Sequence, residues 1–502
     1  MKPFRTLLFF LTVFLCLFAI ALYFPDGGIK LTDDLTLHFV DANDIFSGDK
    51  TEYADIEQII NQNNVLNDSI ISNLADTTKS SWDTVRANAD SLRRTIHRLE
   101  FPGNDPSVLY PIFKAFNQIR KKNELVRILH YGDSQIEGDR MTSLIRNKLQ
   151  KRFGGSGVGL VPASQAYDFS FSLLQKNSDN WYRYTAYGNR DTTLSHNRYG
   201  ALASFATFVP DNIQSSYSDT TTHHAWISFD KSWYGFSNTR SFRQCRIFYG
   251  FNKKPFINEI YQNDHLIDAE IFAPTSKLKV IDWKFDEPQS SLTLKFSGAG
   301  SPEIYGIALD DMKGVAVDNI AMRGSAGLIF TKMDRSLLRQ MYKQLNVKLV
   351  ILQYGGNVIP YISDNGTYYE KLFYKQLTTL RSILPHASFI VVGVADMSKK
   401  EKNKYISYPN IEIVRDALKK ASFDAGVAFW DMYEAMGGKN SMPSWVFANP
   451  PLASKDFVHF NPQGAKIIAQ MFYNAFIYEY EKYEKSDHPL VAENQEENEG
   501  EK

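Results

Sequence analysis

The residues best suited to do chemistry in this chain are a serine on a tight turn and a histidine that follows an aspartate. The apolar run Leu125–Leu129 is typical of a short buried strand, and it leads into Gly132-Asp133-Ser134, with a helical pattern from about Arg140. A serine on such a strand-to-helix turn has its hydroxyl at the carboxyl edge of a sheet, beside backbone N–H groups that favour negative charge. The simpler interpretation is that Asp133 and Ser134 only cap the next helix.

The second group lies far downstream, where Asp456 stands three residues before His459 and a helix start, Asn461-Pro462-Gln463-Gly464, follows directly. A serine nucleophile needs a base within hydrogen-bond reach and a carboxylate that orients this base. Asp456 and His459 can supply both from one loop. Such a spacing arises by chance when it stands alone, but together with Ser134 on its turn it predicts acyl transfer at a serine.

The chain resembles the GDSL/SGNH hydrolases, whose sequence blocks can be matched one at a time. The first block is Gly132-Asp133-Ser134-Gln135, with Gln135 where the family name has Leu, and the last is Asp456 with His459. The second block, a glycine whose N–H helps to form the oxyanion hole, is best matched by Gly324. The third is matched by Gly355-Gly356-Asn357, although Val358 stands where the family has Asp.

The resemblance implies a Ser134–His459–Asp456 triad with an oxyanion hole made by the N–H groups of Ser134 and Gly324 and the side chain of Asn357. We expect no cofactor and no metal.

The chain has the pattern G-D-S-x-x-x-G-D-R, then a predicted helix, then G-x-G-x-G. This arrangement resembles that of bacterial peptidoglycan O-acetylesterases and of the O-acetyltransferase partners of membrane-bound O-acyltransferases. We therefore expect a serine esterase acting on O-acetyl esters of a cell-envelope polysaccharide, and we expect this polysaccharide to be peptidoglycan. Two alternatives stay open: an O-acetyltransferase with the same triad, with a membrane-bound O-acyltransferase as a partner, and a glycan-binding envelope protein with a vestigial triad.

Three other carboxylates are rivals for a catalytic role. Glu137 and Asp139 follow the serine turn and could form a general acid/base pair, although a helix cap and a solvated charge at a helix start are the simpler interpretation. Asp396 follows a predicted strand end, but no spacing requires it in the site. No metal-ligand cluster stands out among the ten histidines, because neighbours such as His223 and His224 point to opposite faces of a strand.

The elements that must position these residues alternate as strands and helices, which predicts an α/β fold with a parallel sheet; the resemblance implies an SGNH-type three-layer α/β/α sandwich. We expect helices over 108–123, 141–153, 331–345, 368–384, 411–425 and from 462 to about 483. Buried strands are expected at 125–130, 304–309, 315–320, 347–354, 388–394 and 427–431, and Gly154 to Pro162 is expected to be a flexible connection. The hydrolase domain would then comprise residues 106–165 and 306–485.

Residues 166–305 interrupt this pattern with short runs in which apolar and polar residues alternate, such as Ala225–Phe229 and Ser291–Phe296. Period-two runs between turn residues predict an inserted antiparallel β-sandwich. The related subgroup carries a sandwich resembling a carbohydrate-binding module at this point. Trp181, Tyr182, Trp233 and Tyr234 are candidates to hold glycan, and the alternative for each is a place in the core.

The apolar run 7–24 matches the roughly 17–25 residues of one bilayer crossing, with Lys2 and Arg5 before it. We expect residues 1–25 to be a signal anchor in the inner membrane, with the catalytic domain in the periplasm; cleavage after Ala19-x-Ala21 is the alternative. Residues 26–105 are expected to be either a polar, partly helical stalk or helices packed against the catalytic domain, and the sequence does not decide between the two. Residues 486–502 are expected to be a disordered acidic tail. The formal net charge of zero gives no indication of a nucleic-acid partner. Cys245 is expected to be a buried small hydrophobe.

Overall fold

The computed structural model describes residues 3–24, 29–32, 35–37, 53–57, 59–60, 97–167, 169–210, 221–363, 365–402 and 404–486. The chain divides into two compact units, Met1–Tyr53 and Ala54–Lys502. Most of the predicted stalk and nearly all of the predicted acidic tail lie outside the described residues.

The first unit contains the helix α1 (Pro3–Tyr23) and an antiparallel pair of short strands, β1 (Ile29–Thr32) and β2 (Leu35–Leu37). Twenty residues of α1, Phe4–Tyr23, have a mean hydropathy of 2.6, so by length and composition this helix could cross a membrane. A signal sequence would satisfy the same criterion, and both predicted alternatives therefore stand.

The second unit is built on a parallel sheet with the strand order β15-β3-β16-β17-β20. Its strands are β3 (Leu125–Gly132), β15 (Gly314–Ala321), β16 (Val347–Gln353), β17 (Ser388–Val392) and β20 (Ala428–Trp430), and every neighbouring pair is parallel. Nearly all of their residues are buried, as expected for strands covered on both faces. This confirms the expectation of an α/β fold with a parallel sheet.

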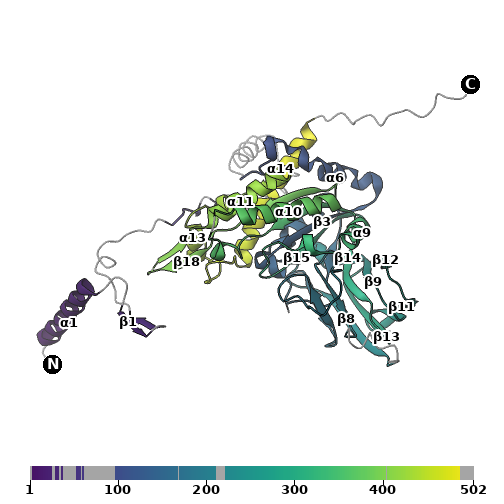
Figure 1. The fold of residues 1–502 in the computed structure, drawn as a ribbon, viewed down its shortest axis with the longest axis horizontal. Helices are drawn as coiled ribbons and strands as arrows, with labels where there is room; N and C mark the ends of the chain where they lie inside the picture. Colours follow the sequence, from purple (N-terminus) through teal and green to yellow (C-terminus); the bar gives the residue numbers. More distant parts are fainter. Residues whose placement is uncertain are drawn as a thin grey trace, which may run out of the picture. The chain divides into compact units, whose positions relative to one another are not determined.

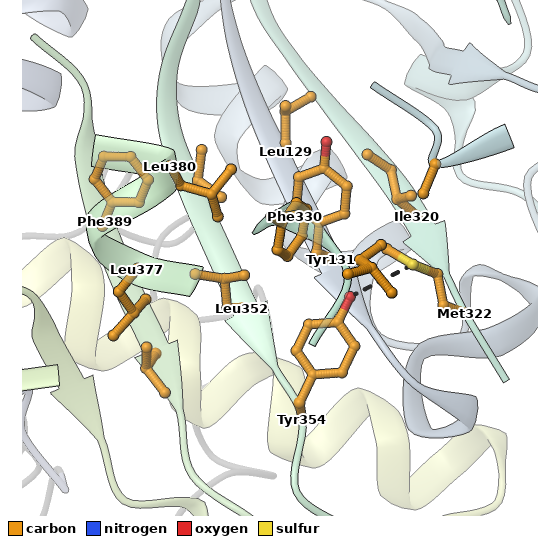
Figure 2. Close-up of a cluster of buried hydrophobic side chains, with 14 of the residues drawn as sticks. Leu129, Tyr131, Ile320, Met322, Phe330, Leu352, Tyr354, Leu377, Leu380 and Phe389 are labelled. Carbon is orange, nitrogen blue, oxygen red and sulfur yellow. Dashed lines mark hydrogen bonds between the residues drawn. The ribbon is translucent and has the colours of Figure 1, made fainter. Parts of the chain in front are cut away.

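Helices cover both faces of this sheet because successive side chains of a strand point to opposite sides. Leu129 and Tyr131 of β3 join a cluster with α9 (Arg335–Leu345), α10 (Thr367–Ile383) and α11 (Ile411–Asp424). Val126 and Ile128 join the other cluster, with α6 (Tyr110–Lys122), α7 (Thr142–Phe153), α13 (Ser441–Phe447) and α14 (Pro462–Lys485). Figure 2 shows part of the first cluster, in which the Tyr354 hydroxyl lies 3.8 Å from the Met322 sulfur.

The segment between the first and second parts of the α/β pattern forms two antiparallel sheets that share one apolar cluster. One sheet has the order β11-β10-β13-β8-β5, with β5 (Leu173–Asn177), β8 (His223–Lys231), β10 (Phe256–Gln262), β11 (His265–Phe272) and β13 (Ser291–Gly298). The other has the order β12-β9-β14-β7-β6, with β6 (Tyr182–Thr185), β7 (Ser204–Thr207), β9 (Phe242–Gly250), β12 (Leu278–Gln289) and β14 (Glu303–Asp310). Figure 1 shows these strands grouped to one side of β3 and β15, away from α11 and α14.

Two expectations near the borders of this segment are wrong. Residues 304–309 belong to β14, which pairs antiparallel with β9 and lies outside the parallel sheet. The glycine-rich run contains β4 (Gly157–Val161), which pairs with β14, and is therefore no flexible connection. A Cβ on Gly157 would lie 2.1 Å from the Leu309 carbonyl oxygen, so the glycines serve a close approach between strands.

A buried ion-paired cluster connects the two kinds of sheet. The guanidinium of Arg127 on β3 donates to Asp310 on β14 and, at 2.5 Å, to Asp318 on β15. Asp318 also accepts the N–H of Leu160 on β4 at 2.9 Å. All three charged side chains are fully buried, and removing one partner of such a group leaves an uncompensated charge.

The remaining elements are short. They are β18 (Ser398–Glu401), β19 (Lys404–Ser407), α12 (Met432–Ala435) and the 3-10 turns η2 (Pro102–Asn104), η3 (Pro106–Leu109), η4 (Ser134–Asp139), η5 (Ser237–Thr239), η6 (Phe330–Lys332) and η7 (Ile359–Tyr361). Of these, η4 matters most, because it carries Ser134.

Candidate active site

The turn after β3 brings Ser134 to the carboxyl edge of the parallel sheet. A Cβ on Gly132 would lie 3.1 Å from the carbonyl oxygen of Gln353 and 2.9 Å from the Ile136 side chain, so a larger residue here would have to displace these neighbours. Asp133 caps η4 by accepting the N–H of Gln135 at 3.0 Å. The capping interpretation is therefore correct for Asp133, whereas the Ser134 hydroxyl is directed to another loop.

That other loop holds the Asp456–His459 pair. The Ser134 Oγ lies 2.8 Å from His459 Nε2, and His459 Nδ1 lies 2.8 Å from Asp456 Oδ2. The second oxygen of Asp456 accepts the N–H groups of Val458 and His459 at 2.9 and 3.0 Å. The structure thus brings together the three side chains that the sequence placed in two distant segments.

The charge of Asp456 is maintained by these contacts. Burial by itself would raise the pKa of Asp456, but hydrogen bonds from the His459 side chain and from the backbone of His459 and Val458 lower it below its usual value. An ionised carboxylate at this position keeps the proton of the imidazole on Nδ1, which leaves Nε2 free to accept the proton of Ser134.

The loop owes its shape to Phe457, whose φ of +58° is unusual for a bulky residue. Its ring stacks on Tyr405 at a centroid distance of 3.5 Å and a plane angle of 7°. The D-x-x-H spacing alone did not reveal this turn, because it depends on an aromatic partner from β19.

Two side chains that the sequence did not single out join the serine turn to the histidine loop. Gln135 donates from Nε2 to the carbonyl oxygen of Val458 at 2.6 Å. Arg140 donates to the Glu137 carbonyl at 2.9 Å and to the Phe460 carbonyl at 3.2 Å. These contacts bracket His459 on both sides. The sequence signals for them were that Gln135 stands where the family name has Leu and that Arg140 ends the G-D-S-x-x-x-G-D-R pattern.

The three expected oxyanion donors differ in whether they already have a hydrogen-bond acceptor. Across the part of the chain that the structure describes, no acceptor is found for the N–H groups of Ser134 and Gly324. Gly324 has a φ of +76° and open space at its Cβ position. The Asn357 Nδ2 is already engaged, at 3.3 Å from Asp133 Oδ2 and 3.2 Å from the Ser325 carbonyl oxygen. These long contacts are weak hydrogen bonds, which a stronger acceptor can replace.

Asp133 is fully buried between these groups. Burial raises the pKa of Asp133 to about 6, although the Gln135 N–H and the nearby His459 act in the opposite direction. Its Oδ1 receives the cap bond and its Oδ2 receives Asn357, so this carboxylate holds both the turn and the third oxyanion candidate.

The rival carboxylates are structural, and the expectation that Glu137 and Asp139 are a cap and a solvated charge is wrong. Glu137 is buried and accepts two N–H groups of Arg323, at 2.8 and 2.5 Å. Asp139 is buried and accepts from Arg146 at 2.6 and 3.2 Å. The local sequence does not reveal these contacts, because Arg323 is 186 positions from Glu137, and Asp139 also accepts the hydroxyl of Ser172, 33 positions away. Asp396 accepts from the Ser407 hydroxyl and the Met442 N–H, at 2.6 and 2.7 Å, and has no contact with the triad.

The four aromatic candidates for glycan contact divide into two classes. Trp181 is a core residue, with its ring packed on Phe208 and Phe296 and its Nε1 donating to the Trp226 carbonyl. Tyr182, Trp233 and Tyr234 are exposed. Cys245 is fully buried, and burial raises the pKa of its thiol well above the usual range.

No group of three or more His, Cys, Asp and Glu side chains is placed to hold a metal ion among the described residues. The arrangement of Ser134, His459 and Asp456 can carry out acyl transfer with the chain's own groups.

Comparison with solved structures finds proteins whose folds resemble that of this chain. A peptidoglycan O-acetylesterase structure matches with a TM-score of 0.59 and 20% sequence identity, over 74% of this chain and 96% of that one. A family two carbohydrate esterase from Cellvibrio japonicus matches at 8% identity over 62% of this chain and 99% of that one, with a TM-score of 0.24. A GDSL-like lipase from Parabacteroides merdae matches at 15% identity over 32% of this chain and 72% of that one, with a TM-score of 0.23.

No protein-family model and no curated protein matches the chain. The likeness to the O-acetylesterase spans nearly the whole of that protein, and it confirms the resemblance drawn from the sequence blocks at the level of the fold. The two likenesses with low TM-scores add nothing to this.

Proposed function

We propose that this protein is an SGNH-type serine esterase that hydrolyses O-acetyl esters on a cell-envelope polysaccharide, and that this polysaccharide is peptidoglycan. The observation that carries the proposal is the continuous chain of 2.8 Å contacts from Ser134 to His459 to Asp456 at the edge of a parallel sheet. The choice of substrate is supported by the fold that the chain shares with a peptidoglycan O-acetylesterase.

In this mechanism the Ser134 Oγ attacks the carbonyl carbon of the acetyl ester, while His459 Nε2 takes the hydroxyl proton. His459 then gives this proton to the departing sugar oxygen, and the acetyl group stays on Ser134. A water molecule gives its proton to the same nitrogen and attacks the acetyl-serine, which releases acetate and restores the hydroxyl. Asp456 holds the imidazole and stabilises its charged form throughout.

The negative oxygen that forms in each step needs donors, and three candidates are at hand. The N–H groups of Ser134 and Gly324 have no acceptor within the described structure, so the oxyanion can take both without competition. Asn357 becomes the third donor by exchanging one of its weak bonds, to Asp133 or to the Ser325 carbonyl, for the charged oxygen.

The architecture proposed for this activity is a three-layer α/β/α hydrolase in two parts, 106–165 and 306–485, interrupted by a carbohydrate-binding-module-like sandwich at 166–305. Residues 1–25 would anchor the protein in the inner membrane, with the hydrolase in the periplasm. Within 26–105, Ile56 and Leu99 pack in the apolar cluster that contains residues of α6 and α14, which supports a segment packed against the hydrolase over a stalk along its whole length. The strands β4 (157–161) and β14 (303–310) extend the antiparallel region slightly beyond this insert.

The alternative within the same chemistry is an O-acetyltransferase, in which a sugar hydroxyl replaces water and a membrane-bound O-acyltransferase acts as a partner. A partly exposed His459 favours hydrolysis, since its side chain is 29% exposed and water can reach it. A glycan-binding protein with a vestigial triad is the third hypothesis, and the intact hydrogen-bonded triad argues against it.

The test is acetate release from O-acetylated peptidoglycan by the full-length protein, with and without an added sugar acceptor. Ser134→Ala should abolish release and leave glycan binding intact, whereas Ser336→Ala, which alters an exposed serine of α9, should change neither. Undiminished release by Ser134→Ala would refute the nucleophile. Acetyl groups appearing on the acceptor instead of in solution would assign the transferase.

A further inference from the structure

We infer that Phe169, Trp233 and Tyr234 form a stacking platform, the aromatic platform, for sugar rings of the same glycan chain that carries the ester. This inference rests on the proposed function and specifies how the polymeric substrate is held. The three side chains are 49%, 71% and 75% exposed. Single exposed aromatic residues are common, but a group of them beside a reaction centre indicates a binding surface.

The loop that carries Trp233 and Tyr234 is fixed on the hydrolase. It joins β8 to β9 in the antiparallel region, yet Phe236 packs against the apolar cluster that contains residues of α7 and α14. A sheet of the inserted region therefore delivers two exposed rings to a defined place on the hydrolase surface.

Hydrogen bonds hold the same loop in one conformation. The Arg240 guanidinium donates to the carbonyl oxygens of Trp233 and Gly235 at 3.0 and 2.9 Å, and the Tyr234 N–H donates to the Ser232 hydroxyl at 3.3 Å. A preorganised pair of rings costs little conformational entropy when it binds a ligand.

A second segment connects this loop to the serine turn. The Phe171 N–H donates to the Gly138 carbonyl at 3.0 Å, and the Ser172 hydroxyl donates to Asp139. A Cβ on Gly235 would lie 3.2 Å from the Ser172 Cα, which shows how closely the two segments pack.

The platform lies within reach of the nucleophile. The Phe169 ring is 6.2 Å from the Tyr234 ring, centroid to centroid, and Phe169 lies 3.6 to 3.7 Å from the Cβ position of Gly138. Gly138 is four residues beyond Ser134, and four residues span at most about 14 Å. A ring stacked on the platform can thus belong to the same glycan chain as the ester at Ser134.

The chemistry of the platform matches a sugar chain. A pyranose ring presents a face of C–H groups and a rim of hydroxyl groups, which suits an aromatic face with polar groups around it. Trp233 has such a surrounding, because the Lys231 ammonium and the Arg240 guanidinium lie 5.2 and 5.9 Å from its ring centre.

The test compares a polymeric and a small substrate in the full-length protein. The double variant Trp233→Ala/Tyr234→Ala should raise the KM for O-acetylated peptidoglycan about tenfold, since two stacking contacts are lost, with kcat unchanged. Its kcat/KM for 4-nitrophenyl acetate should stay the same. Trp233→Phe, which keeps a ring, should retain most of the wild-type affinity, and Tyr374→Ala, at an exposed tyrosine of α10, is the matched control.

Three outcomes would overturn the platform: an unchanged KM for peptidoglycan, an equal loss on both substrates, or a loss of the same size in Tyr374→Ala. If the wild-type protein fails to hydrolyse even 4-nitrophenyl acetate, the proposed function fails instead. The platform is then judged by co-sedimentation of Ser134→Ala with insoluble peptidoglycan, which the double variant must weaken. Unchanged co-sedimentation would refute a glycan platform and leave a lipid or protein partner for these rings.

Discussion

The hydrogen bond from Gln135 to Val458 offers the sharpest test of how the site is assembled. It joins residues that are 323 positions apart and holds the histidine loop against the serine turn at 2.6 Å. We expect Gln135→Leu, which introduces the residue of the family name, to let His459 leave its contact with Ser134 for part of the time. The triad side chains themselves are unchanged in this variant.

The size of the effect follows from the bond. A typical hydrogen bond contributes about 0.5–1.5 kcal/mol net, and about 1.4 kcal/mol corresponds to a tenfold change in rate. We therefore expect kcat for 4-nitrophenyl acetate to fall about two- to tenfold. Stability should change less, because the Gln135 Oε1 is buried without a partner among the described residues and leucine removes this unsatisfied atom.

Gln150→Leu is the matched control. Gln150 is also buried, donates to a backbone carbonyl, that of Gly157, at 3.1 Å, and has an unsatisfied Oε1. It should lose stability in denaturant unfolding to a comparable extent and retain its kcat. If Gln135→Leu keeps the wild-type kcat, or if both variants lose kcat equally, Gln135 does not position the histidine loop.

Two further predictions concern the oxyanion hole and a buried carboxylate. If Asn357 is an oxyanion donor, Asn357→Ala should lower kcat by about 10²–10³ with little effect on KM. A fall in kcat of less than threefold in steady-state assays would show that Asn357 is not an oxyanion donor and serves only to hold Asp133. Asp396→Asn should change the pH dependence of unfolding, because burial raises the pKa of Asp396 to about 6 in the folded protein. The protonated form is the one that folding favours, so the wild type should lose stability relative to the variant as the pH rises from about 4 to 6, by at most about 1.4 kcal/mol per pH unit. Parallel curves for the two proteins in urea unfolding between pH 4 and 7 would contradict this.

The features that the sequence predicted best are those that short segments determine. The buried strand at 347–354 is found as β16 (Val347–Gln353), and the helices expected at 368–384 and 411–425 are found as α10 and α11 within one residue at each end. Apolar runs and helical periodicity are local properties of the sequence. They predicted these elements correctly because each element buries the residues that its apolar pattern marks as buried.

The errors concern residues whose surroundings come from distant parts of the chain. From the sequence, the glycines within 154–159 resemble a flexible link. In the structure β14 and β15 lie directly against them, and the glycines are what allows these strands to approach so closely. Glu137 looks like a solvated charge because its partner, Arg323, is 186 positions away. The turn at Phe457 depends in the same way on Tyr405.

The proposed choice between water and a sugar hydroxyl as acceptor depends on what covers His459 after Ser134 is acylated. In the free protein the side chains of His459 and Asp456 are 29% and 48% exposed, so water has direct access to the base. A transferase must exclude this water at the acyl-enzyme stage, and none of the contacts among the described residues closes the site over His459. A bound glycan could do so, and a chain held on the aromatic platform would come to this region from the side of Gly138. The exposure of His459 therefore favours hydrolysis over transfer in the proposed mechanism. Transfer to a sugar hydroxyl would require an acceptor bound tightly enough to displace water from His459 Nε2.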